Sequence, residues 1–129
     1  MFNFFNLGKL FQITSRSTRY VFVLFMIVLA IGLSESLFLS PEDYKQSHSV
    51  RIMYVHVPAA WMALLSYTLM AVFSAVALIW RHPLANVMAR SVAPIGASFT
   101  LICLITGSLW GQPTWGTWWV WDARLTSVL

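Results

Sequence analysis

Five of the seven tryptophans in this chain lie within one short stretch near its carboxyl end, and a single carboxylate, Asp122, follows the last of them. The five are Trp110, Trp115, Trp118, Trp119 and Trp121. An aromatic belt at a membrane surface explains one or two tryptophans per helix end, because the indole ring is apolar and its N–H needs a partner. The density therefore favours either an unusually aromatic interfacial surface or a platform for a flat aromatic ligand.

His56 is the residue whose chemistry best complements such a platform. A neutral imidazole is a standard axial ligand of haem iron, and the guanidinium groups of Arg51 and Arg124 pair well with carboxylates such as haem propionates. Together with the tryptophans these residues describe a haem-sized site. Taken alone, His56 is better explained as an interfacial histidine at the start of a helix, and the haem interpretation depends on the tryptophans and arginines around it. His48, in a polar loop, and His82, at the other end of the second apolar run, are expected to lie outside the site.

Asp122 closes the tryptophan-rich stretch, and its partner is left open by the spacing. Its carboxylate can accept a hydrogen bond from a tryptophan N–H or a backbone amide, or it can pair with Arg124. The side chains from Trp115 to Asp122 follow helical spacing, which predicts a short amphipathic helix in the plane of the interface. Gly111, Pro113 and Gly116 predict that the third transmembrane helix ends and the chain turns before that short helix.

Three apolar runs must position these residues. The chain has 129 residues, of which 59% are hydrophobic and 9% charged, a composition too apolar for an ordinary soluble domain. The runs cover 20–39, 57–80 and 92–110, each about the length that crosses a bilayer as a helix. Pro41 helps to stop the first helix, and Pro58 suits the first turn of the second. The predicted fold is an all-α membrane protein with three transmembrane helices and a tryptophan-rich interfacial segment.

This pattern divides the chain into three regions. Residues 1–19 form an interfacial lead-in, 20–110 the three-span region, and 111–129 the tryptophan-rich segment. The last residues, "ARLTSVL", resemble the opening of a further helix. Because the second and third spans run in opposite directions, His56 and the stretch from Trp110 to Asp122 are expected to share one end of the helix pair.

Several functions are disfavoured by composition. The eight cations are scattered singly, without the basic stripe that nucleic-acid binding needs. The single cysteine, Cys103, excludes an internal disulfide and any cysteine-pair motif, and it is expected to act as a small hydrophobic residue. We find no acid–base pair or activated nucleophile, so hydrolytic chemistry is not expected.

The placement of Lys and Arg predicts the orientation of the spans. Five cations flank the spans on the side of the amino terminus, and three lie on the opposite side. The first group is Lys9, Arg16, Arg19, Arg81 and Arg90, and the second is Lys45, Arg51 and Arg124. Since cytoplasmic loops carry the excess of Lys and Arg, the amino terminus is expected in the cytoplasm. The segment 40–56 and everything after Trp110 are then periplasmic.

Two segments together carry a family resemblance. "WGQPTWGTWWVWDARLTS" (110–127) resembles the tryptophan-rich WWD signature of proteins that handle haem in cytochrome c maturation, and "RIMYVHVPAAWMA" (51–63) fits the same group. The similarity is to the amino-terminal half of the CcmC family and covers essentially the whole chain. The related CcsA and CcmF families usually continue from Trp-Asp into Pro, where this chain has Ala123.

The resemblance implies a six-span fold with the WWD segment on the periplasmic face of the bacterial inner membrane. It implies two haem-ligating histidines, of which His56 matches the first and the second has no counterpart in this chain. The five tryptophans, Asp122, Arg51 and Arg124 match the family's haem site. The implied function is to hold b-type haem without a covalent bond and to deliver it to the haem chaperone CcmE. CcmD and the transporter CcmAB are the further partners implied, beside membrane lipid.

Two other readings remain open from the sequence. One is a haem–apocytochrome c ligase of the CcsA or CcmF type, which would need thiol substrates. The other is a structural or quinone-binding membrane subunit that uses the tryptophans as a belt.

The predicted topology can be tested with a reporter enzyme that is active only in the periplasm. Fused after Leu129, the reporter should be active, because three spans carry the chain from a cytoplasmic amino terminus to the periplasmic side. Activity of a cytoplasm-specific reporter at the same position would instead overturn the placement of His56 and the tryptophans together.

Overall fold

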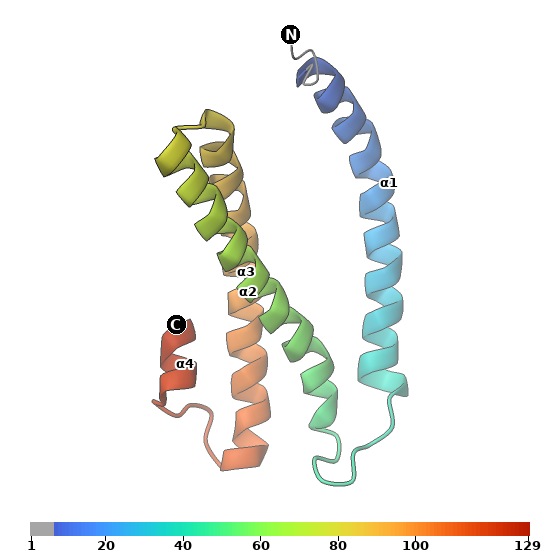
Figure 1. Cartoon of the computed structure of the whole chain (residues 1–129). Coiled ribbons are helices and arrows are strands. Elements are labelled where there is room, and N and C mark those ends of the chain that lie inside the picture. The colour runs from blue at the N-terminus through green and yellow to red at the C-terminus, as the bar shows by residue number, and fades with distance from the viewer. Residues whose placement is uncertain (1–6) are drawn as a thin grey trace. The chain divides into compact units, whose positions relative to one another are not determined.

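A computed structural model describes residues 7–129, with side chains described from residue 14 onward. Over that range the chain is helical, with no strand beyond one isolated bridge between Asp43 and Ser47. The elements are α1 (Leu7–Ser34), a π-helical turn η1 (Glu35–Leu39), α2 (Val50–Trp80), α3 (Pro83–Trp115) and α4 (Ala123–Val128) (Figure 1). Three segments are long and apolar enough to cross a membrane: Thr14–Leu39, Val50–Trp80 and Pro83–Trp115. The all-α, three-span prediction is confirmed.

The first compact unit ends at Ser40 and consists of α1 and η1. Serine hydroxyls bond back to the helix here: Ser36 Oγ donates to the Gly32 carbonyl at 2.6 Å, and Ser40 Oγ donates to the Ser36 carbonyl at 2.8 Å. Ser40 is extended (ψ 138°), as expected for a residue that precedes proline. The predicted role of Pro41 in ending this helix agrees with that geometry. Residues 1–6 of the predicted lead-in lie outside the described residues.

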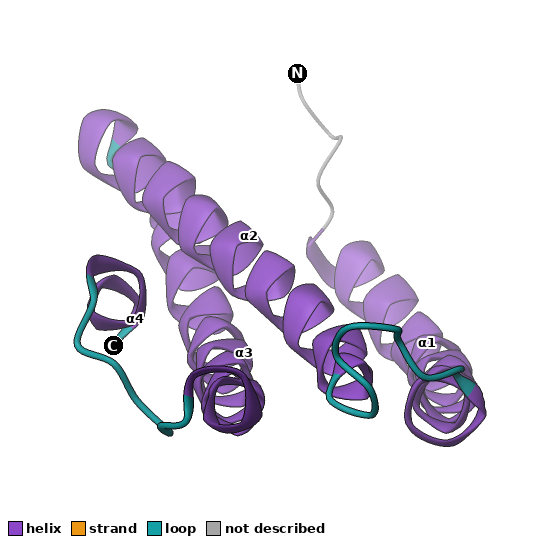
Figure 2. Cartoon of the chain, turned by 90° about the horizontal axis from the view of Figure 1, so that it is seen from below, coloured by secondary structure: helices purple, strands orange, loops and turns teal. Residues whose placement is uncertain are grey.

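The second compact unit, residues 41–129, is built on an antiparallel hairpin of α2 and α3. Arg81 and His82 make the turn, with Arg81 in the left-handed conformation (φ 51°) and Pro83 opening α3, a first-turn position that proline favours. The two helices lie side by side in both views, and α4 lies beside α3 (Figures 1 and 2).

Small residues bring α2 and α3 together. Ser66 of α2 and Gly96 of α3 are both buried, and a Cβ on Gly96 would lie only 3.0 Å from the Ser66 Cβ. Ala59 and Ala85 are the other buried small side chains of the pair. Close backbone approach through such residues is the usual basis of helix association in lipid, where burial of apolar surface gives no driving force.

The second and third helices are longer than the apolar runs predicted at 57–80 and 92–110. In particular α2 begins at Val50, so the expectation that Pro58 occupies its first turn is wrong. Backbone bonds from Arg51 N to the His48 carbonyl and from Ile52 N to the Ser49 carbonyl, both 3.2 Å, start the helix earlier. Pro58 therefore lies inside α2, where it removes one helical hydrogen bond. His56 is likewise an interior residue of α2, and its side chain contacts α3.

The close contact at Gly96 gives a testable stability difference. Gly96→Ala should lower the free energy of unfolding, measured by SDS titration in mixed micelles, because its Cβ meets Ser66. Gly32→Ala is the matched control: a Cβ there meets nothing within 4 Å, so it should be neutral or stabilising by up to ~1 kcal/mol. Equal effects at both glycines would contradict the packing described.

Candidate functional site

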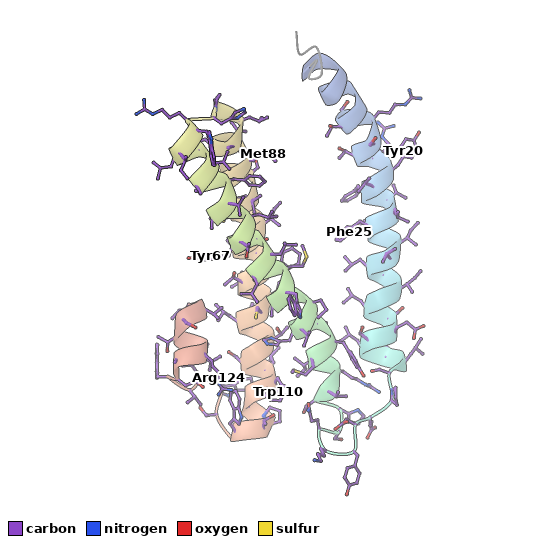
Figure 3. All side chains as sticks on the ribbon, viewed as in Figure 1. Tyr20, Phe25, Tyr67, Met88, Trp110 and Arg124 are labelled. Atoms are coloured by element: carbon purple, nitrogen blue, oxygen red, sulfur yellow. The ribbon has the colours of Figure 1, made fainter. Side chains whose placement is uncertain are left out.

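A cavity of about 470 Å³ lies at the open end of the hairpin, away from the Arg81–His82 turn, between α2, α3 and α4. Its lining is largely apolar, with His56 and Arg124 as the strongly polar side chains. The lining residues are Met53, His56, Ala60, Cys103, Leu104, Gly107, Trp110, Trp115, Arg124, Leu125 and Val128. Figure 3 shows Trp110 and Arg124 at this end of the unit and Met88 toward the other. The volume falls in the range of small-molecule sites.

Helical periodicity explains why these residues share one wall. On α2, Met53, His56 and Ala60 recur at the spacing that places side chains on one face. On α3, Cys103, Gly107 and Trp110 do the same. Each helix thus presents a single stripe to the cavity, and α4 closes the third side.

His56 is held against α3 by three neighbouring residues. Its Nδ1 lies 3.0 Å from Thr106 Oγ1 and 3.9 Å from Cys103 Sγ. A Cβ on Gly107 would lie 3.1 Å from His56 Cε1, so glycine leaves the space that the imidazole occupies. In the described part of the chain Nε2 has no hydrogen-bond partner, and the His56 side chain lines the cavity.

Trp110 and Trp115 form the aromatic wall of the cavity. Their rings meet edge to face, with centroids 5.4 Å apart and an interplanar angle of 86°. Trp110 Nε1 donates to Gln46 Oε1 at 3.0 Å, which ties this wall to the loop before α2. The ring of Trp115 folds back over Gly111, where a Cβ would lie 3.1 Å from its Cε3.

Asp122 organises the return of the chain into α4. Its Oδ1 accepts the Leu125 N–H at 2.9 Å as the helix N-cap, and its Oδ2 accepts Arg124 Nε at 2.9 Å. The Arg124 guanidinium lies over the Trp115 ring, 5.5 Å from its centroid, a cation–π arrangement. The Leu125 amide, followed by the hydrogen bond from Arg124, lowers the pKa of the Asp122 carboxyl below its ordinary value. Of the partners left open by the sequence, the carboxylate has two: a backbone amide and Arg124.

The predicted helix from Trp115 to Asp122 is wrong. α3 continues through Gly111 and Pro113 and ends at Trp115, where Gly116 adopts a left-handed conformation (φ 75°) and its N–H closes the helix on the Gln112 carbonyl at 3.0 Å. The chain then runs without helix to Asp122. Thr117 Oγ1 donates to the Trp119 carbonyl at 3.1 Å within this segment. Local side-chain bonds of this kind compete with helix formation.

The predicted site residues divide into two groups. His56, Trp110, Trp115 and Arg124 line the cavity. Trp118, Trp119, Trp121 and Arg51 are not among its lining residues. Asp122 is connected to the cavity by its hydrogen bonds with Arg124 and Leu125, which both line it. Trp118 and Trp121 are largely exposed, at 58% and 76%. Trp119 is half-buried and packs edge to face on Trp121 with centroids 5.8 Å apart.

Three residues around the His56 ring were not predicted as site residues: Cys103, Thr106 and Gly107. A signal for them exists in the sequence, because His56 and Gly107 lie equally far from the Arg81–His82 turn. In an antiparallel hairpin, equal distance from the turn places residues opposite one another. Using that signal requires the turn position, which the apolar runs alone leave uncertain by several residues.

The fold and the cavity define a class: a multi-span helical membrane protein with a tryptophan-walled pocket that contains one histidine. The sequence profile of the CcmC family, described as Heme exporter protein C, matches residues 1–129. The chain belongs to this family.

Individual relatives agree with the family match. The chain is 50% identical over 124 residues to Heme exporter protein C of Bradyrhizobium diazoefficiens, covering 96% of this chain and 47% of the relative. It is 46% identical over 121 residues to the protein of that name from Escherichia coli K12, covering 94% and 49%. A putative cytochrome c biosynthesis ccmC-like mitochondrial protein of Marchantia polymorpha is 53% identical over 118 residues, covering 88% and 51%. The chain spans about half the length of these relatives.

The bonds of Asp122 predict a pH dependence. Because the pKa of this carboxyl is lowered in the folded chain, its contribution to the order of α4 is complete at neutral pH and is lost only as the pH falls through that lowered value. Near-UV circular dichroism, which reports tryptophan packing, should therefore hold constant from pH 7 to about pH 5 and change in more acid solution.

Two substitutions isolate the carboxylate in this experiment. Asp122→Asn keeps an N-cap but carries no charge, so its acid transition should be smaller than that of the unsubstituted chain. Asp122→Ala removes both roles and should show weakened tryptophan packing already at neutral pH. An acid transition of unchanged size in Asp122→Asn would rule out this carboxyl as its origin.

Proposed function

We propose that the cavity and the adjoining tryptophans hold haem at the periplasmic face of the bacterial inner membrane, for delivery to the haem chaperone CcmE in the maturation of c-type cytochromes. The observation that carries the proposal is the combination of His56, with Nε2 unpartnered among the described residues, and a cavity walled by Trp110 and Trp115. Membership of the CcmC family supports it, and the chain's relatives are named heme exporter proteins.

The residues present fit a metalloporphyrin cargo. Iron in a porphyrin accepts an imidazole nitrogen as an axial ligand, and His56 offers one beside the aromatic wall. Arg124 uses its Nε and Nη2 for Asp122. Since a guanidinium has five N–H donors, further donors remain for a propionate. Holding Arg124 between Asp122 and Trp115 fixes its direction before cargo arrives, which lowers the entropy lost on binding.

The segment 116–122 provides the outer part of the proposed site. Trp118 and Trp121 present their rings outward, where they contact the face or edge of haem that extends beyond the cavity. Arg51, close to the start of α2, is a second proposed partner for a propionate. An open aromatic surface suits a protein that must also release its cargo, because a fully enclosing pocket would slow dissociation.

The complete haem site of the proposal also uses residues from the part of the relatives' length that this chain does not cover. In the proposal a second axial histidine comes from outside the residues of this chain, and CcmD and the transporter CcmAB are its partners in the membrane. The haem is b-type and is held without a covalent bond. His56 and the tryptophans then lie on the periplasmic side, with the amino terminus in the cytoplasm, as the distribution of Lys and Arg predicts.

The division of labour between His56 and the tryptophans can be measured with protein purified from membranes and supplied with haem. His56→Ala should shift or weaken the Soret band while part of the haem remains associated, because the directional iron bond is lost and the aromatic contacts stay. His48→Ala is the matched control and should leave the spectrum unchanged. An unaltered spectrum in His56→Ala would show that the ligand assignment is wrong.

The exposed tryptophans should affect retention instead of ligation. Combining Trp118→Ala with Trp121→Ala should increase the rate at which haem is lost to apomyoglobin by roughly tenfold, since apolar contact of ~25 cal/mol per Å² is removed. Trp80→Ala, at the opposite end of α2 and 69% exposed, is the control and should not change that rate. Equal rates in all three proteins would make the segment a docking surface for a partner or for lipid.

A further inference from the structure

Thr106 occupies the point where the His56 ring meets α3. Its Oγ1 lies 2.7 Å from the Ile102 carbonyl oxygen of the preceding helical turn and 3.0 Å from His56 Nδ1. The carbonyl of Cys103 is a third neighbour, at 3.2 Å. One hydroxyl group is therefore in contact with two backbone acceptors and one ring nitrogen, although it has a single proton to donate.

The position of that proton follows from the chemistry of the neighbours. A carbonyl oxygen can only accept, and two oxygens 2.7 Å apart with no proton between them would repel each other, so the hydroxyl proton belongs to the Ile102 carbonyl. The contact with His56 is then a hydrogen bond only if Nδ1 carries a proton and donates it to Thr106 Oγ1. In a neutral imidazole this leaves Nε2 as the basic nitrogen.

Gly107 and Cys103 complete the surroundings of the ring. A Cβ on Gly107 would press on Cε1 of His56 at 3.1 Å, so glycine at this position allows the ring to approach Thr106. Cys103 Sγ, at 3.9 Å from Nδ1, is a weak and distant acceptor by comparison. Thr106 is thus the neighbour that selects between the two tautomers.

We infer that Thr106 is a positioning residue that holds His56 in its Nδ1–H tautomer, with Nε2 basic and available to the cavity. This inference rests on the proposed haem site for its functional meaning, because an axial ligand must offer a lone pair and not an N–H. Without a partner on Nδ1, a neutral imidazole in water favours the proton on Nε2, which blocks that nitrogen. Partners of this type raise the affinity of histidine sites for metals by typically 10- to 100-fold.

The tautomer can be read directly, without haem, by solid-state NMR of membrane-embedded protein labelled with ¹⁵N-histidine at alkaline pH. The His56 signals, identified by their loss in His56→Ala, should show a protonated Nδ1 and an unprotonated Nε2. Thr106→Ser retains the hydroxyl and should keep this pattern. Thr106→Val is close in shape but has no acceptor, and it should move the proton to Nε2. Thr68→Val is the matched control, since Thr68 makes the same bond to its own helix, at 2.9 Å, and has no hydrogen bond to a histidine in the described part of the chain.

Haem affinity is the second measurement on the same proteins. Thr106→Val should weaken haem binding by about tenfold or more, with Thr106→Ser and Thr68→Val close to the unsubstituted protein. An unprotonated Nδ1 in the unsubstituted protein, or a proton that stays on Nδ1 in Thr106→Val, would overturn the inference. If the NMR pattern is as expected and the unsubstituted protein binds no haem, the tautomer assignment stands and the proposed function fails. If haem binds and Thr106→Val binds it equally well, the proposed function stands and Thr106 has no part in it.

Discussion

The contact between the His56 imidazole and the backbone of α3 at Gly107 is the constraint on which the rest of the site depends. α2 and α3 can approach closely here because Gly107 has no side chain, in the same way that Gly96 lets them approach at Ser66. This approach brings His56 Nδ1 to Thr106. It also places Met53 and Ala60, on the same face of α2, in the wall of the cavity that Trp110 lines from α3. A larger residue at position 107 would displace the His56 imidazole, which lines the cavity.

A second set of contacts fixes the opposite wall. Asp122 caps α4 and binds Arg124, Arg124 lies over Trp115, and Trp115 rests on Gly111. Each contact is modest, because exposed ion pairs and single cation–π contacts contribute little to stability on their own. Their value is geometric: they place a cation and an aromatic ring at the cavity, although the intervening segment has no regular secondary structure.

The three long helices and the position of His56 at the same end of the hairpin as Trp110 and Trp115 could be predicted from sequence. Apolar runs of membrane length permit few arrangements, and a hairpin brings its free ends together. The conformation of residues 116–122 could not be predicted from the sequence. The spacing of its tryptophans is compatible with a helix, and the outcome is decided by Gly116, whose left-handed conformation ends α3, and by Asp122, which caps the next helix. The start of α2 was also misplaced, because Pro58 is compatible with a first helical turn but lies inside a helix that begins at Val50. The role of Thr106 could not be predicted from the sequence, because it depends on the register between α2 and α3.

The most direct test of this account is a structure of the haem-loaded protein in a lipid nanodisc, determined by electron cryo-microscopy. Density for a porphyrin is expected at the open end of the α2–α3 hairpin, with iron within bonding distance of His56 Nε2. One face or edge of the porphyrin should lie against Trp110 and Trp115, and a propionate should be directed to Arg124. Haem located elsewhere, or bound here through a residue other than His56 while the His56 ring remains against Thr106, would contradict it.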